Sequence, residues 1–213
     1  MVEIKVLSKP EWVSWDDIHE LLIAAHKKNI EKGMSMRIPQ MSPEELKTKL
    51  GEDGRCYVAL ANDKLVGTTS VRFYQGRSWY DKGQLVAHSM LSAILPKYQG
   101  IGITEDLNEL RDDYIRKMGA KIIHADTAEN NLVVRKKAKL NGFKEVAFHA
   151  YKSPHYSVIF VKWLGVCPFS ETYIQKKFKI SRFLTKLQYK PGRIEKSIFL
   201  SFLCKVARKL LSV

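Results

Sequence analysis

The stretch from residue 84 to residue 128 constrains the fold most, because it predicts a strand, a helix and a second strand in close succession. QLVAHSMLSAIL (84–95) is typical of a long strand, and KIIHADTA (121–128) predicts another one. Between them, a proline and a Gly-rich turn lead into an amphipathic helix over 104–119. A helical crossover of this length is what parallel strands need, so parallel pairing is expected around this helix.

The remaining pattern predicts a mixed sheet in a single domain. A second crossover helix is expected over 130–141, again with parallel pairing around it, and the other strands can be antiparallel. Ser14 and Ser42 are expected to cap two N-terminal helices that end at Gly33 and Gly51. The other expected strands cover residues 2–7, 55–61, 64–74, 143–152 and 155–164, with Asn62-Asp63 and Ser153-Pro154 as hairpin turns.

Composition excludes several classes of protein. With 213 residues and 45% apolar residues, the chain is long enough for a sizeable core. No stretch of about 18 uncharged apolar residues predicts a membrane span, and the N-terminus lacks the apolar segment of a secretory signal. Three scattered cysteines predict neither a disulfide framework nor a zinc site, and no metal-ligand cluster is expected. A reduced, cytoplasmic location is expected.

Positive charge is concentrated at the C-terminus. The net charge is +14, and the segment from Gly165 to the end holds 11 basic and two acidic residues. Such a segment favours an anionic partner: anionic lipid, nucleic acid or a polyanionic substrate.

The turn QGIGIT joins a strand to the start of a helix. A helix start has unpaired backbone N–H groups and the positive end of the helix dipole. Gly100 and Gly102 carry no side chain, so an anion can approach the main chain closely. The turn is neither a Walker motif nor a Rossmann fingerprint. It is interpreted either as a pyrophosphate site or as a plain turn.

This segment resembles motif A of the GNAT superfamily of N-acetyltransferases, whose signature is Arg/Gln-x-x-Gly-x-Gly/Ala. Gln99 and Gly102 match it, and Thr104 stands where Gly or Ala is usual. Family members typically carry an Asn about 30 residues later and Gly-Phe eleven and twelve positions after that. This chain has Asn131 and Gly142-Phe143 at that spacing. The resemblance covers residues 1–164.

The resemblance implies a GNAT-like α/β domain over residues 1–164, followed by a basic amphipathic helical tail over 165–213. The sheet would be mixed and mostly antiparallel, with a parallel pair splayed at its centre. Acetyl-CoA is the implied co-substrate, its pantetheine running along the end of strand 84–95 and its pyrophosphate on the glycine turn. The implied acetyl-CoA contacts are Ser92, Ala93, Ile94, Leu95, Gln99, Gly100, Ile101, Gly102, Ile103, Thr104 and Asn131.

The predicted reaction is direct transfer of an acetyl group to a primary amine in a ternary complex. The amine must be neutral to attack, so a base is needed. His88 is the candidate, since a period of two places it on one strand face with Met90 and Ser92. The alternative is a histidine that fills the sheet face. In many members of the family a Tyr acts as the general acid for the leaving thiolate, and this chain has Ala138 at that position.

Other side chains are candidates for binding the acceptor. His124 and Asp126 share one face of strand 121–128 and are interpreted either as substrate or proton-relay residues or as hydrogen-bonded sheet residues. Tyr151 in the last hairpin and the aromatic loop 73–83 lie in regions that often face the acceptor in this fold.

Three interpretations compete for the tail. Its helices pack on the domain or on a second subunit in a homodimer, they anchor the protein to the anionic inner face of the membrane, or they contact nucleic acid. No nucleic-acid motif supports the third. The acceptor could be a small molecule, an amino sugar or a lipid-linked amine. Two other functions compete: a non-catalytic module that binds CoA or a partner, and an acetyltransferase directed at RNA or the ribosome.

Overall fold

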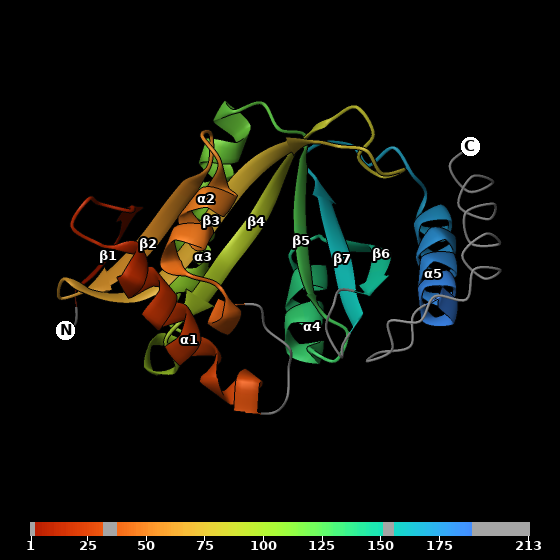
Figure 1. The fold of residues 1–213 in the computed structure, drawn as a ribbon. Coiled ribbons are helices and arrows are strands. Elements are labelled where there is room, and N and C mark those ends of the chain that lie inside the picture. The colour runs from red at the N-terminus through yellow and green to blue at the C-terminus, as the bar shows by residue number, and fades with distance from the viewer. Residues whose placement is uncertain (1–2, 32–37, 151–155, 189–213) are drawn as a thin grey trace. The chain divides into compact units, whose positions relative to one another are not determined.

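The computed structural model describes residues 3–31, 38–150 and 156–188. The chain forms two compact units (Figure 1). Unit 1 consists of Met1–Gly76 and Gly83–Lys121, and unit 2 consists of Arg77–Lys82 and Ile122–Val213.

Unit 1 is a four-stranded antiparallel sheet with helices on both faces. Its strands are neighbours in chain order: β1 (Ile4–Ser8), β2 (Arg55–Ala61), β3 (Lys64–Gln75) and β4 (Leu85–Ile94). Its helices are α1 (Trp15–Glu31), α2 (Pro43–Leu50) and α3 (Ile103–Lys117), with short 3-10 turns at η1 (Ile38–Gln40) and η2 (Pro96–Tyr98). From Cys56 to Ala61 the strand β2 is apolar, because these residues are buried on both faces of the sheet. Cys56, Val58 and Leu60 pack with α1 and α2, whereas Tyr57 and Ala59 pack with α3.

Local capping chemistry fixes the ends of the N-terminal helices as expected. The Ser42 side chain accepts the Glu45 N–H, and the Glu45 carboxylate accepts the Ser42 N–H, which makes a complete capping box at α2. Gly51 ends this helix with φ +72°. Ser14 and Asp17 form the same reciprocal pair at α1. The end expected at Gly33 lies outside the described residues.

Unit 2 contains a three-stranded antiparallel sheet in the order β5-β7-β6. The strands are β5 (Ile122–Ala128), β6 (Lys144–Ala150) and β7 (Tyr156–Trp163), and the helices are α4 (Leu132–Leu140) and α5 (Glu171–Gln188). The expected parallel pairing around helix 130–141 is wrong. The short connection between β6 and β7 makes these two strands neighbours, and β7 therefore lies between β5 and β6.

The helix α5 packs against β6. Its Ser181 hydroxyl accepts the Phe148 N–H at 3.0 Å, and its buried Thr185 hydroxyl donates to the Phe148 carbonyl at 2.9 Å. Ile174 is 2% exposed, and Phe178 joins a core built on Phe148. This half of the tail therefore packs on the domain, as one of the three interpretations expected. The second tail segment, 189–213, lies outside the described residues, and the domain boundary at residue 164 stays a prediction.

None of the described helices combines the length and the apolar character needed to cross a membrane.

Candidate functional site

The strand β4 reaches the turn before α3 through a defined set of hydrogen bonds. The Leu95 N–H donates to the Val66 carbonyl at 2.9 Å, which holds the strand end on β3. The Gln99 side-chain amide donates to the Ile94 carbonyl at 3.0 Å. Gln99, the first matched position of the motif, therefore has a structural role. Its side chain satisfies the last carbonyl of β4 and stabilises the turn.

The glycines of the turn leave its main chain open. Gly100 and Gly102 have φ of +82° and +92°, and a Cβ at either position would meet no atom within 4 Å. Gly102 is the N-cap of α3, and its carbonyl accepts the N–H groups of Glu105 and Asp106. The N–H groups of Ile103 and Thr104, which precede these two, have no acceptor within the helix.

This geometry suits the diphosphate of acetyl-CoA. Unpaired N–H groups at a helix start attract anions, and a bare backbone lets a phosphate approach to hydrogen-bonding distance. The first turn of α3 also holds the carboxylates of Glu105 and Asp106. Both residues are exposed, so water and salt weaken their repulsion of an anion.

A β-bulge interrupts β4 at Leu91 and Ser92, shortly before the glycine turn. Ser70 of β3 faces Met90 and Thr68 faces Ala93, so Thr69 alone opposes both Leu91 and Ser92. Leu91 takes φ +52° and packs against the core under α1 and α2. Left-handed backbone at a leucine costs about 1–2 kcal/mol.

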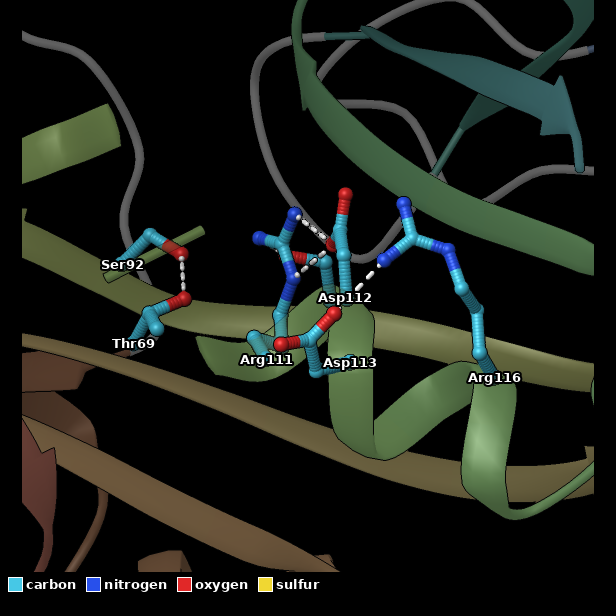
Figure 2. A network of polar contacts seen from close by, with 7 residues as sticks. Thr69, Ser92, Arg111, Asp112, Asp113 and Arg116 are labelled. Atoms are coloured by element: carbon cyan, nitrogen blue, oxygen red, sulfur yellow. Dashed lines mark hydrogen bonds and ion pairs between the residues drawn. The ribbon is translucent and has the colours of Figure 1, made fainter. Parts of the chain in front are cut away.

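The bulge overturns one prediction about strand faces. His88, Met90 and Ser92 were expected on one face, but the extra residue rotates Ser92 away from the other two. The Ser92 hydroxyl lies 2.7 Å from the hydroxyl of Thr69, which is opposite Tyr57 on the α3 face of the sheet (Figure 2). Thr69 is 1% exposed, so this hydroxyl pair is part of the bulge's internal structure.

His26 of α1 also contacts the bulge. Burial lowers the pKa of His26. A hydrogen bond to the backbone of Ser92 raises it, but by less. The imidazole is therefore held neutral near pH 7. His26 is not among the site residues predicted from the sequence, although it continues the row Ile18-Leu22-His26 at four-residue spacing on the buried face of α1.

His88, the candidate base, lies half-buried in the middle of β4. The Arg72 side chain donates from Nε to His88 Nδ1 at 3.3 Å, and the ring of Tyr74 meets the imidazole edge-on. A guanidinium N–H on Nδ1 places the proton of the neutral ring on Nε2. The base role of His88 stays a prediction.

A buried arginine fastens α3 to β4. Arg111 is 5% exposed; it donates from Nη1 to the Ser89 hydroxyl at 2.8 Å and from Nε and Nη2 to Asp112 (Figure 2). The apolar spacing of this helix predicts an inward row of Leu107, Leu110, Tyr114 and Met118. The fully buried row is Ile103, Leu107, Arg111 and Ile115, because the helix turns its paired arginine toward the sheet.

Among the residues predicted in unit 2, Asn131 has a local structural role. The Asn131 side chain caps α4 by accepting the Val134 N–H, and it donates to the Thr127 hydroxyl at 3.3 Å. On β5, His124 and Asp126 share one face, the first half-buried and the second exposed. Tyr151 lies outside the described residues. The roles of these four residues toward coenzyme and acceptor stay predictions.

Two further positions in unit 2 contribute to its packing. Ala138 packs against the core of Phe148 and Phe160, so this position packs with the core of unit 2. In the loop 73–83, Trp79 packs edge-on against Phe169 and Tyr173 at centroid distances of 5.2 and 5.6 Å. This aromatic side chain therefore fixes the start of α5.

Comparison with known proteins identifies the family. Residues 15–143 match the model of the acetyltransferase (GNAT) family. A comparison with curated proteins finds no significant match.

Solved structures share the fold at low sequence identity. A GNAT-family acetyltransferase from Staphylococcus aureus Mu50 is 13% identical, with a TM-score of 0.59 over 76% of this chain and 100% of that one. The ribosomal-protein-S18-alanine N-acetyltransferase from Escherichia coli is 14% identical, with a TM-score of 0.58 over 79% and 97%. A chain of the NatC complex bound to Gag peptide and CoA is 16% identical, with a TM-score of 0.60 over 76% and 99%. These likenesses confirm the expected fold class, and with the family match over more than half of the sequence they show that the chain belongs to the GNAT family of acetyltransferases.

Proposed function

We propose that this protein transfers an acetyl group from acetyl-CoA to a primary amine. The observation that carries the proposal is the open main chain at Gly100 and Gly102, directly at the start of α3, in a chain of the GNAT family. The N–H groups there bind the diphosphate, and the end of β4 then lies beside the pantetheine arm.

The chemistry proceeds by direct attack of the amine on the acetyl carbonyl carbon. A C–N bond forms, the C–S bond breaks, CoA leaves as the thiolate, and the ammonium proton passes to a base or to water. A covalent acyl-enzyme is not part of this proposal. Burial raises the pKa of the Cys56 thiol, so this cysteine is not a thiolate nucleophile at neutral pH.

The amines of peptide N-termini are the first acceptors to test. Two solved structures with this fold are a ribosomal-protein-S18-alanine N-acetyltransferase and a complex bound to a peptide and CoA. Small amines and amino sugars form the second group to test.

The test is release of CoA thiol from acetyl-CoA with each class of amine, together with calorimetric titration of CoA. The proposal expects saturable CoA binding and amine-dependent thiol release that is lost in the Gly102→Asp variant. CoA binding without thiol release for any amine would favour the non-catalytic alternative. Absence of CoA binding would overturn the proposal and would leave only a module that binds a partner.

A further inference from the structure

The two units differ completely in charge. Unit 1 has 16 basic and 16 acidic side chains, whereas unit 2 has 20 basic and six acidic ones, so the net charge of +14 belongs to unit 2. The asymmetry is therefore wider than the tail alone, since it includes the sheet and helix α4 of unit 2.

Exposed apolar side chains follow the same division. Among the described residues, seven of the nine large hydrophobic side chains that are exposed belong to unit 2. They are Leu132, Val133, Val134, Leu140, Val166, Phe183 and Leu187.

Helix α4 combines these two properties on one side. Helical spacing places Leu132, Val133 and Leu140 on the same side as Lys136 and Lys137. Leu140 is 77% exposed and Val133 is 70% exposed. The helix has no acidic residue and no fully buried one.

Helix α5 repeats this arrangement on the side opposite β6. Phe183 and Leu187 are exposed and four residues apart. Lys179 lies one turn and Lys176 two turns before Phe183 on the same side. The residues that face β6 are different ones, such as Ser181 and Thr185.

Ion pairs neutralise the acidic side chains near the two helices and link α5 to the residue Glu129. Glu129, just before α4, accepts Arg182 of α5 at 2.7 Å and lies 3.1 Å from the Lys186 ammonium. Glu145 pairs with Arg135 and Lys139. In the described part of unit 2, the remaining lysines of the two outward sides, Lys136, Lys137, Lys176 and Lys179, have no acidic partner.

We propose that unit 2 binds an anionic phospholipid bilayer through the outward sides of α4 and α5. Lysines attract the lipid phosphates, and the leucine, valine and phenylalanine side chains enter the boundary between headgroups and acyl chains. A nucleic acid fits this surface less well, because single-strand binding uses aromatic platforms. The aromatic rings of Trp79, Phe169 and Tyr173 pack on one another instead.

The test is co-sedimentation of the full chain with vesicles of phosphatidylcholine alone and with about 30% phosphatidylglycerol. Each lysine near an anionic surface contributes roughly a fivefold factor in partitioning. The double change Lys136→Gln and Lys137→Gln is therefore expected to weaken binding to the anionic vesicles about 25-fold, as is Lys176→Gln with Lys179→Gln. Leu140→Ser and Phe183→Ser should weaken it without changing the charge.

The matched control is Lys27→Gln with Lys28→Gln, two exposed neighbouring lysines on α1 of unit 1. This pair should leave vesicle binding unchanged, and circular dichroism should show all variants folded. The proposal would be overturned by no binding to anionic vesicles, by equal loss in the control pair, or by full binding in the α4 and α5 variants. Full binding in the α4 and α5 variants would assign membrane binding to residues 189–213 alone. Binding to RNA in place of vesicles would also overturn it.

Discussion

A charge at Gly102 tests whether the start of α3 holds a diphosphate. Gly102 has φ +92°, and a Cβ there would meet no protein atom within 4 Å. Asn and Asp both tolerate left-handed backbone better than other residues and have nearly the same shape. Gly102→Asn and Gly102→Asp therefore share a backbone penalty of about 1 kcal/mol in the free energy of unfolding. They differ in one negative charge.

The expected difference in affinity follows from the distance between charges. A carboxylate about 5 Å from one phosphate charge, in an effective dielectric constant of about 30, is repelled by about 2 kcal/mol. That energy corresponds to roughly a 30-fold weaker binding of CoA to Gly102→Asp than to Gly102→Asn. The difference should shrink as the salt concentration rises, because the site is exposed.

Calorimetric titration with CoA measures both affinities, and urea unfolding measures both stabilities. The matched control is Gly119 at the other end of α3, with φ +75° and equally open space. Gly119→Asn and Gly119→Asp should lose similar stability but bind CoA within about twofold of each other, since this position is far along the helix from the turn. Equal affinity of the two Gly102 variants would refute the diphosphate site.

Three further predictions concern stability. Burial lowers the pKa of His26 in the folded state, so the unfolded chain binds a proton at this imidazole at higher pH than the folded chain does. The free energy of unfolding therefore falls as pH drops below about 6.5. His26→Asn should reduce this loss of stability, as measured by urea unfolding between pH 7.5 and 5.5. Thr69→Val removes the hydroxyl bonded to Ser92 in the bulge and should cost about 1 kcal/mol in thermal unfolding, whereas no change would mean that the pair does not stabilise the bulge. Ser42→Ala breaks the capping box and should cost about 1 kcal/mol, and Glu45→Ala should cost less, because it leaves the serine cap in place.

The features that sequence predicted well depend on neighbours in the chain. The serine caps, the glycine after α2 and the Asn62-Asp63 hairpin turn are all present, and Asn62 and Asp63 have φ of +46° and +61°. Each of these depends on hydrogen bonds or dihedral preferences within about five residues. The glycine turn before α3 belongs to the same class, because the positive φ of Gly102 is a local property.

The features that sequence missed depend on partners far along the chain. The same sequence of strands and helices is compatible with the observed order β5-β7-β6 and with the expected parallel pairing around α4. Only the pairing of β7 with both β5 and β6 distinguishes the two arrangements. Arg111 is buried because Ser89 and Asp112 satisfy its guanidinium, and no periodic pattern of apolar residues indicates a buried cation.

The bulge in β4 shows why a candidate site is harder to predict than the fold around it. An alternating pattern assumes that each residue of a strand pairs with one residue of the neighbouring strand. At Thr69 of β3, two residues of β4 oppose a single residue. Among the described residues, Leu91 alone has positive φ without being Gly, Asn or Asp. This strained leucine and the left-handed Gly100 and Gly102 fall within twelve residues, in the segment whose main chain the coenzyme would contact. Backbone strain persists where the surroundings impose it and often marks functional segments. The failure of the two-residue period at Leu91 thus supports the same site as the glycine turn, on independent geometric grounds.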